Sequence, residues 1–353
     1  MRQIGYYFFK YWISLGLFFY FKKIRITGLD DMPSNKPTLL LSNHQNALLD
    51  VLLIAAKSNL KPWYLTRSDV FKNKLFSPLF YFLQMLPIYR MRDGKDTLAK
   101  NEAIFNRCGD LLADRQTLLI FPEANHNLKR RVRPLSKGFT RIIFKALEKN
   151  PELDINLVPV GQNYKSAASF PDSAALCFGK PIAVQDLLEE NTNKTVSQIK
   201  LTVTKQLKQL TTHIDSETGY DYILTALKNE GIDFLNPELA NNSIKNLDAK
   251  GFLKTEAKHQ VLNKIMKWIF VLFNFPLVFV WRTFVKPKVP EPEFMSTFRF
   301  AFSMIAYPIC YLFFLVALAN VYSIKKACLI IVLHAFCNIL FVKFALTSSV
   351  QRK

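Results

Sequence analysis

A histidine and an aspartate with five residues between them, His44 and Asp50, have the types and spacing needed for acid–base chemistry. They follow the apolar run Thr38–Ser42, which is typical of a buried strand. Imidazole titrates near neutral pH, and a carboxylate on its other nitrogen fixes the tautomer and raises the basicity of the ring. The pattern predicts a general base at the end of a strand. This pair alone leaves open the alternative that the histidine only satisfies the N-terminus of a helix.

A second polar stretch, Glu123-Ala124-Asn125-His126, follows the apolar run Thr117–Phe121. Its carboxylate, amide and imidazole groups are suited to binding a polar substrate. The basic run Lys129–Arg133 comes next and could hold an anionic headgroup through charge-assisted hydrogen bonds, although such runs are often only solvated. The histidine of this stretch, together with the first pair, also permits a metal-dependent hydrolase. The sequence has no cluster of histidines and carboxylates with the spacing of a zinc site, so we predict no metal.

The elements that must position these residues alternate between apolar strand-like runs and helix-like stretches. The predicted strands are Lys22–Ile26, Thr38–Asn43, Trp63–Thr66, Leu86–Met91, Thr117–Phe121, Asn156–Gln162 and Ala175–Gly179. The predicted helices are Leu48–Ser58, Val70–Gln84, Asp96–Ala113 and Phe139–Lys149. The alternation predicts an α/β fold with a mostly parallel sheet flanked by helices. Because ligands bind beyond the carboxyl ends of such strands, we expect His44, Arg90 and Glu123 to meet at that edge.

Hydrophobic residues make up 50% of the 353-residue chain and gather at its two ends. The segment from Ile4 to Phe21 is crowded with aromatic residues, which predicts a helix at the membrane interface. Near the other end, Phe300–Tyr322 and Ala327–Leu346 are each about 20 residues long, the length that crosses a bilayer. A shorter segment before them, Trp268–Trp281, is interrupted by Asn274-Phe275-Pro276. We predict an integral membrane protein with two spanning C-terminal helices.

The formal net charge of +20 fits a nucleic acid, an anionic membrane or an anionic substrate as partner. Many cations flank the apolar segments, which favours membrane lipids as partners, and the sequence contains no recognisable nucleic-acid-binding module. With two spans, Arg282, Lys286, Lys288 and Arg299 lie on one side and only Lys325-Lys326 cross the membrane. The positive-inside rule then places the catalytic domain in the cytoplasm. The five widely separated cysteines show no disulfide or metal-site spacing, in agreement with a reducing compartment.

A polar stretch rich in Asn and Lys separates the strand-forming region from the apolar C-terminal segments. We therefore divide the chain into a membrane-associated helix (1–22), a catalytic domain (23–183), a helical extension (184–263) and a membrane region (264–353). Composition also permits a noncatalytic basic protein that binds anionic lipid. Such a protein would tolerate the loss of His44 but not charge reversal at Lys22 and Lys23.

Four stretches, in order, resemble the glycerolipid acyltransferase superfamily, which includes lysophosphatidic acid and glycerol-3-phosphate acyltransferases. Asn43, His44 and Asp50 match its first block. The second, third and fourth blocks are matched by Pro87-Ile88-Tyr89-Arg90-Met91-Arg92, Phe121-Pro122-Glu123-Ala124-Asn125-His126 and Leu157-Val158-Pro159-Val160-Gly161. The common first block has four residues between His and Asp; five resemble the branch of glycerol-3-phosphate/dihydroxyacetone-phosphate acyltransferases. The usual Gly-Thr-Arg of the third block is replaced here by Ala124-Asn125-His126, which removes an expected arginine.

The resemblance implies an acyltransferase of phospholipid biosynthesis that needs no cofactor. It would move a fatty acyl group from acyl-CoA or acyl-ACP to the hydroxyl of glycerol 3-phosphate or 1-acyl-glycerol 3-phosphate. It implies that His44 deprotonates this hydroxyl while Asp50 orients the ring, and that Arg90, Arg92 and the third block contact the acceptor. A different lipid acceptor, such as an acyl-amino acid, stays an alternative. The spacing does not place His44 and Asp50 on one face of an ideal helix, so the turn after the strand must bring them together.

Overall fold

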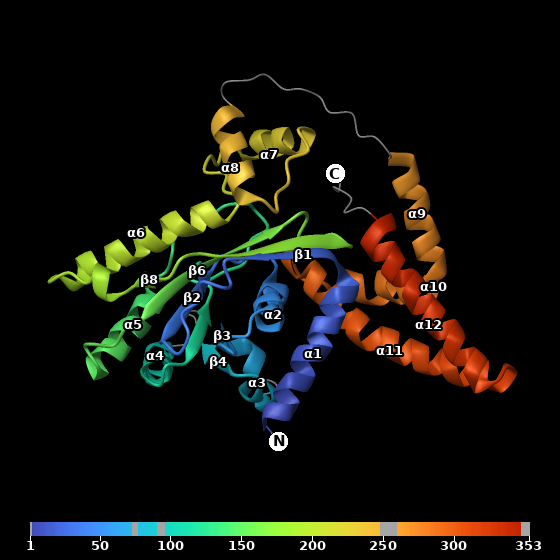
Figure 1. Ribbon diagram of the computed structural model, residues 1–353, viewed down its shortest axis with the longest axis horizontal. Helices are drawn as coiled ribbons and strands as arrows, with labels where there is room; N and C mark the ends of the chain where they lie inside the picture. Colours follow the sequence, from blue (N-terminus) through green and yellow to red (C-terminus); the bar gives the residue numbers. More distant parts are fainter. Residues whose placement is uncertain (1, 73–76, 90–95, 248–259, 347–353) are drawn as a thin grey trace.

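The computed structural model describes residues 2–72, 77–89, 96–247 and 260–346 (Figure 1). Its centre is an eight-stranded sheet in the order β1-β7-β6-β2-β5-β3-β4, with β8 paired to β6. The strands are β1 Phe21–Thr27, β2 Thr38–Ser42, β3 Trp63–Arg67, β4 Met85–Ile88, β5 Thr117–Ile120, β6 Asn156–Tyr164, β7 Asp172–Phe178 and β8 Ile182–Ala183. Neighbouring strands are parallel except that β6 runs antiparallel to β7 and β8. The predicted mostly parallel sheet is confirmed.

Side chains alternate across the sheet, so each face has its own core. Leu39 and Leu41 of β2 belong to one core, and Leu40 belongs to the other. The first face is covered by α4 (Thr97–Ala113), α5 (Gly138–Lys149) and α6 (Thr192–Leu210). The second is covered by α1 (Arg2–Tyr20), α2 (Ala47–Lys57) and the start of α11 (Met295–Val321) (Figure 1). Each of these leucines is completely buried, which stabilises the fold by about 1.5–3 kcal/mol per side chain. β2 is therefore fixed from both sides where it runs into the candidate site.

The predicted helix Val70–Gln84 differs from the structure. Its described part consists of a 3-10 helix, Ser68–Lys72, and a short helix α3, Ser77–Phe82. Over the described residues the prediction was wrong at both ends, because the start is a 3-10 helix and α3 ends at Phe82. Pro78 has no backbone N–H and fits in the first turn of α3. A new helix begins there, and β4 follows it directly.

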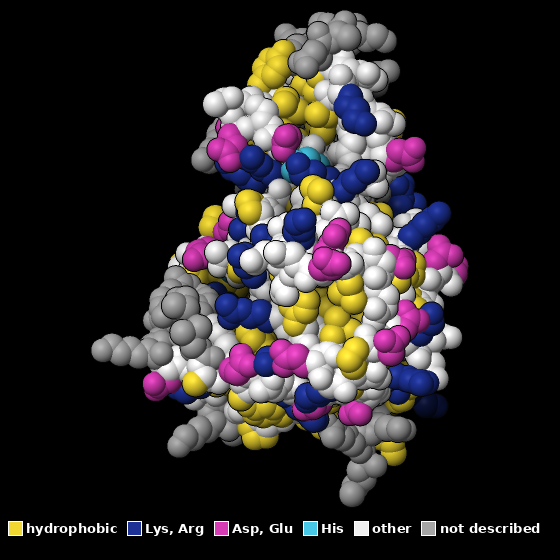
Figure 2. Space-filling view, turned by 90° about the vertical axis from the view of Figure 1, so that its left-hand side faces the viewer, with side chains coloured by type: hydrophobic (Ala, Val, Ile, Leu, Met, Phe, Trp, Pro, Cys, Tyr) yellow, Lys and Arg dark blue, Asp and Glu magenta, His cyan; other side chains and the backbone are white. Residues whose placement is uncertain are grey.

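The predicted helical extension is arranged in two parts. α6 lies along the sheet and contributes Ile199, Val203 and Leu207 to its core. The helices α7 (Tyr220–Asn229) and α8 (Pro237–Asn246) form a separate unit above the sheet, with a small core of their own (Figure 1). Figure 2 looks at the end of the molecule formed by α5 and α6, where Lys and Arg side chains are interspersed with Asp and Glu. Such mixed charge is typical of a surface that faces water.

Two of the described helical segments, Pro292–Val321 and Ile324–Ala345, are long and apolar enough to cross a membrane. They contain α11 and α12 (Ile324–Leu340), which extend away from the sheet as a hairpin (Figure 1). Before them, α9 (Gln260–Phe273) and α10 (Phe275–Val280) meet at a bend of 96°. Pro276 in the first turn of α10 cannot continue the hydrogen bonding of α9. The expected interruption of this segment is confirmed.

The apolar hairpin of α11 and α12 is hydrogen-bonded to the sheet domain at its near end. Lys343, which follows α12, donates to the carbonyl of Phe21 at the start of β1 over 2.7 Å. Arg299, in α11, donates to the carbonyl of Ala168 in the loop after β6 over 3.3 Å. These contacts place the start of α11 next to the strand ends that carry the candidate site.

Candidate active site

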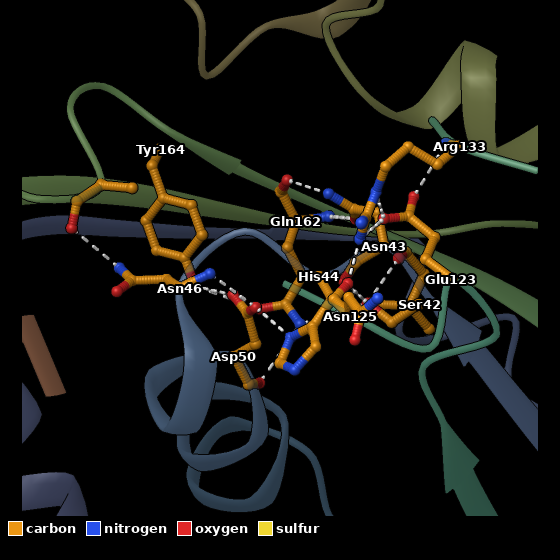
Figure 3. Close-up of polar contacts among 12 residues, drawn as sticks. Ser42, Asn43, His44, Asn46, Asp50, Glu123, Asn125, Arg133, Gln162 and Tyr164 are labelled. Carbon is orange, nitrogen blue, oxygen red and sulfur yellow. Dashed lines mark hydrogen bonds and ion pairs between the residues drawn. The ribbon is translucent and has the colours of Figure 1, made fainter. Parts of the chain in front are cut away.

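His44 lies in the turn between β2 and α2, and Asp50 lies in the first turn of α2. Nδ1 of His44 and Oδ2 of Asp50 are 2.7 Å apart (Figure 3). The turn passes through Ala47, whose φ of 43° lies in the left-handed region, and it returns the carboxylate to the ring. The expectation that the turn brings the two residues together is confirmed. The Asp50 side chain is 0% exposed and that of His44 is 16% exposed, so a substrate can reach the pair only at the ring.

The Asp50 carboxylate accepts from two donors besides His44. Oδ2 accepts from the backbone N–H of Asn46 at 2.8 Å, and Oδ1 accepts a short hydrogen bond from the Tyr164 hydroxyl. Burial raises the pKa of Tyr164 well above its ordinary value, so its phenol keeps the proton that it donates. A buried carboxylate is costly unless such donors satisfy it. Because Nδ1–H of His44 donates to Asp50, the neutral ring presents Nε2 as its acceptor. No residue that the structure describes hydrogen-bonds to this nitrogen.

Strand β6, which is the neighbour of β2 in the sheet, is hydrogen-bonded to the turn between β2 and α2. The Asn43 side chain donates to the carbonyl of Gln162 at 3.0 Å and accepts from its N–H at 2.7 Å. The Gln162 amide in turn donates to Ser42 Oγ at 3.1 Å and to the carbonyl of Asp50 at 3.2 Å (Figure 3). The Asn43 side chain therefore links the end of β2 to β6 by two hydrogen bonds and limits the movement of the neighbouring His44.

The stretch after β5 forms a second wall of the site. The Phe121 ring stacks on the His44 ring with centroids 4.1 Å apart. Glu123 accepts from Arg133, with Oε2 2.8 Å from Nη2 and 3.1 Å from Nε. Burial raises the pKa of the Glu123 carboxyl, and the charge of Arg133 opposes this shift. The same guanidinium also donates to the carbonyl of Asn125. Arg133 thus holds the turn in which Ala124, at the position of the usual glycine, has a left-handed φ of 65°.

His126 ends this turn and lies beside the first histidine. The rings of His44 and His126 meet edge to face with centroids 5.7 Å apart. Nε2 of His126 is 3.1 Å from Oε2 of Glu291, and its ring packs against Phe294 with centroids 4.6 Å apart. Glu291 and Phe294 belong to the segment that leads into α11. The membrane region therefore contributes a wall of the site.

Of the other cations that the sequence indicates for the site, those after β5 are described and those after β4 are not. Arg90 and Arg92 lie outside the described residues. In the basic run after β5, Arg130 is buried and Arg131 pairs with Glu217 at 2.6 Å, so these cations are engaged within the fold. Within the ranges that the structure describes, no group of three or more His, Cys, Asp and Glu side chains is placed to hold a metal ion.

Two residues of the site, Tyr164 and Glu291, were missed by the sequence prediction, and Arg133 was included only as a member of the basic run. The position of Tyr164 could have been found from the sequence. Val158, Val160 and Tyr164 are an even number of residues apart on β6, so all three point to the face of the sheet that α2 covers. Arg133 is one cation among several in a basic run, and nothing local distinguishes it. Glu291 reaches the site only through the packing of the membrane hairpin.

Residues 23–162 match the model of the acyltransferase family. The chain is 28% identical over 122 residues to glycerol-3-phosphate O-acyltransferase 1 of Saccharomyces cerevisiae, a match that covers 33% of this chain and 16% of that protein. It is 26% identical over 140 residues to a chloroplastic 1-acyl-sn-glycerol-3-phosphate acyltransferase of Arabidopsis thaliana, covering 39% of this chain and 36% of that protein. The chain thus spans well under half the length of these relatives.

Among solved structures, the chain is similar to the 1-acyl-sn-glycerophosphate acyltransferase PlsC from Thermotoga maritima. The TM-score is 0.44 at 13% identity, over 59% of this chain and 80% of that one. The family match runs from within β1 to within β6 and includes His44, Asp50 and the turn after β5. Residues 23–162 are therefore similar to acyltransferases that act on glycerolipids, and the similarity includes the turn that carries His44 and Asp50.

Proposed function

We propose that this protein transfers a fatty acyl group from acyl-CoA or acyl-ACP to the hydroxyl of glycerol 3-phosphate or 1-acyl-glycerol 3-phosphate. The observation that carries the proposal is the His44–Asp50 pair, a base at the end of β2 whose partner carboxylate is buried and fully hydrogen-bonded. The acceptor class is supported by relatives named for these two acceptors. Helices that could span a membrane suit an enzyme whose product is a lipid.

In the proposed reaction, Nε2 of His44 takes the proton of the acceptor hydroxyl while the hydroxyl oxygen attacks the thioester carbonyl carbon. The C–S bond then breaks, and the imidazolium returns the proton to the leaving thiolate, so the base is restored without an acyl-enzyme. Asp50 holds the Nδ1–H tautomer before the attack and stabilises the imidazolium after it. Positioned proton transfer contributes about 10²–10⁴ in rate.

We place the acceptor beside the turn that contains Glu123 and His126, because this turn flanks the histidine ring. Arg90 and Arg92, which match the second block of the family, stay our proposed ligands for the acceptor phosphate. The sheet domain faces the cytoplasm in this proposal, where acyl-CoA or acyl-ACP is available.

The test is a labelled-acyl transfer assay with the full-length protein in detergent. It offers both carriers and a panel of acceptors: glycerol 3-phosphate, its 1-acyl derivative, dihydroxyacetone phosphate and an acyl-amino acid. We expect His44→Ala and Asp50→Asn to lower kcat by about 10²–10⁴. His213→Ala is the matched control, because His213 bonds to the backbone of Val132 away from the pair. Substantial turnover in His44→Ala would overturn the assignment of the base, whereas transfer only to another acceptor would change the substrate and leave the chemistry standing.

A further inference from the structure

Two adjoining cavities lie where the membrane region meets the sheet domain. The larger, of about 600 Å³, lies between α9–α10 and α11. The smaller, of about 240 Å³, lies between α1, α11 and the end of α12. They adjoin because both are lined by Phe170, Phe270, Ser303 and Tyr307. Sites for small ligands have volumes of roughly 300–1,000 Å³, so the larger cavity has the size of a binding site and the smaller one extends it.

The larger cavity is cationic. The basic residues in its wall are Lys267, Arg282, Lys286 and Arg299. Glu291 also lines it, but this carboxylate is bound to His126 on its other side. Within the described part of the chain, no carboxylate pairs with Arg282, Lys286 or Arg299. The wall therefore carries four cations and one carboxylate, and this excess of positive charge attracts an anion.

The smaller cavity is apolar. Its wall is formed mainly by side chains such as Trp12 and Phe19 of α1, Phe300 and Met304 of α11, and Val342 after α12. Because it shares four wall residues with the cationic cavity, the two together match a ligand with an anionic end and a hydrocarbon end. They also lie at the near end of the membrane hairpin, the level at which lipid headgroups meet water.

We propose that the two cavities bind one single-chain anionic lipid, with its phosphate among Arg282, Lys286 and Arg299 and its acyl chain in the apolar cavity. The headgroup end adjoins the proposed acyl-transfer site, because Glu291 lines the cationic cavity and binds His126, whose ring touches that of His44. This lipid site lies outside the His44–Asp50 pair, and binding to it does not require turnover.

Trp12 lines the apolar cavity and is placed to report the end of the acyl chain, whereas Trp281 lines the cationic cavity where the headgroup would lie. The probe is 1-acyl-glycerol 3-phosphate with bromine near the end of its acyl chain, because bromine quenches indole fluorescence on contact. It is added to full-length His44→Ala protein in nonionic detergent, so that nothing is consumed. We expect a saturable component of the quenching that is absent from a Trp12→Phe variant, above any unsaturable quenching of the exposed Trp268 by lipid in the micelle.

The charge requirement is tested with paired variants. Arg282→Gln combined with Lys286→Gln is expected to weaken the apparent affinity by about tenfold or more. The matched control removes two charges at the far end of the hairpin, Lys325→Gln with Lys326→Gln, and is expected to leave affinity unchanged. Arg299 is left intact because its hydrogen bond to Ala168 also holds α11 in place. Equal weakening in the two double variants would overturn the proposal.

Two further measurements test the contributions of the headgroup and of the acyl chain separately. The same brominated chain on neutral glycerol is expected to bind at least tenfold more weakly, and equal binding would overturn the proposal. Inorganic phosphate is expected not to displace the lipid at concentrations comparable to that of the probe. If it did, the cavity would bind a soluble anion instead of a lipid. Binding is measured with His44→Ala protein, and transfer is measured separately with the unsubstituted protein. Failure to bind the lipid would therefore overturn the lipid site and leave the proposed acyl transfer standing. Absence of transfer with intact binding would overturn the proposed acyl transfer and leave the lipid site standing.

Discussion

At the residue scale, the buried carboxylate of Asp50 sets the state of the histidine. The N–H of Asn46 and the hydroxyl of Tyr164 hold the carboxylate in one orientation while the ring gains and loses a proton. Tyr164 is only 1% exposed, so it cannot touch a substrate and acts as a positioning residue. Its effect on transfer must therefore pass through Asp50 to His44.

We predict that Tyr164→Phe lowers kcat by about tenfold and leaves KM for both substrates unchanged. Phenylalanine keeps the packing but leaves Oδ1 of Asp50 without its hydroxyl donor, a loss of about 1–3 kcal/mol, part of which falls on the transition state. Steady-state kinetics would measure this, with Tyr220→Phe as control, because the Tyr220 hydroxyl accepts from the N–H of Arg130 instead. A raised KM with unchanged kcat would contradict a positioning role.

At the element scale, the turn after β5 depends on one ion pair. Glu123 has a 2% exposed side chain, and Arg133 binds both its carboxylate and the carbonyl of Asn125. Removing the cation from a buried carboxylate leaves its charge uncompensated, which is costlier than removing both partners. The pair therefore holds the shape of the wall beside His44 instead of offering a free cation to a substrate.

We predict that Arg133→Met lowers kcat/KM more than Glu123→Gln does, and that the double variant recovers part of the loss. Without Arg133 the pKa of Glu123 rises further, because burial is no longer opposed, whereas glutamine in its place has no charge to compensate. A cycle of kcat/KM values for the four proteins should give a coupling of about 0.5–3 kcal/mol. Arg131→Met serves as control, since its partner Glu217 is exposed. Simply additive losses would show that Glu123 acts on the substrate by itself.

The sheet and the His44–Asp50 pair could be predicted because both are local. Short continuous apolar runs give the buried strands, and β2 and β5 end beside each other, so their following residues must meet. The wall formed by Glu291 could not be predicted, because it depends on how the membrane hairpin packs against the domain. Gly161 shows a similar limit. A Cβ at this position would lie 2.1 Å from the carbonyl oxygen of Leu210, so the residue must be glycine for α6 to end against β6. The resemblance of the fourth block to the family does not give this reason.

At the scale of the whole molecule, positive charge is distributed unequally between the two ends of the membrane hairpin. Arg299 and Lys343 lie at the end that is fastened to the sheet domain, and Lys325 and Lys326 lie at the far end. Arg282, Lys286 and Lys288 add to the near end. The positive-inside rule then predicts that the near end and the sheet domain face the cytoplasm. The bent pair α9–α10 fits this arrangement if it dips into the membrane and returns to the same side or lies in the interface.

We predict that both ends of α9–α10 lie on the cytoplasmic face and that only the tip of the α11–α12 hairpin is exposed opposite. The measurement uses a protein without its five natural cysteines, into which Lys264→Cys, Lys288→Cys or Lys325→Cys is introduced singly. In sealed vesicles with the cytoplasmic face outward, a membrane-impermeant maleimide should label positions 264 and 288 but not 325, and permeabilised vesicles should label all three. Labelling of 264 and 288 from opposite faces would establish α9–α10 as a third span, because a bend of 96° is compatible with either path. Labelling of 325 from the cytoplasmic face would reverse the orientation and separate the proposed base from a cytoplasmic thioester.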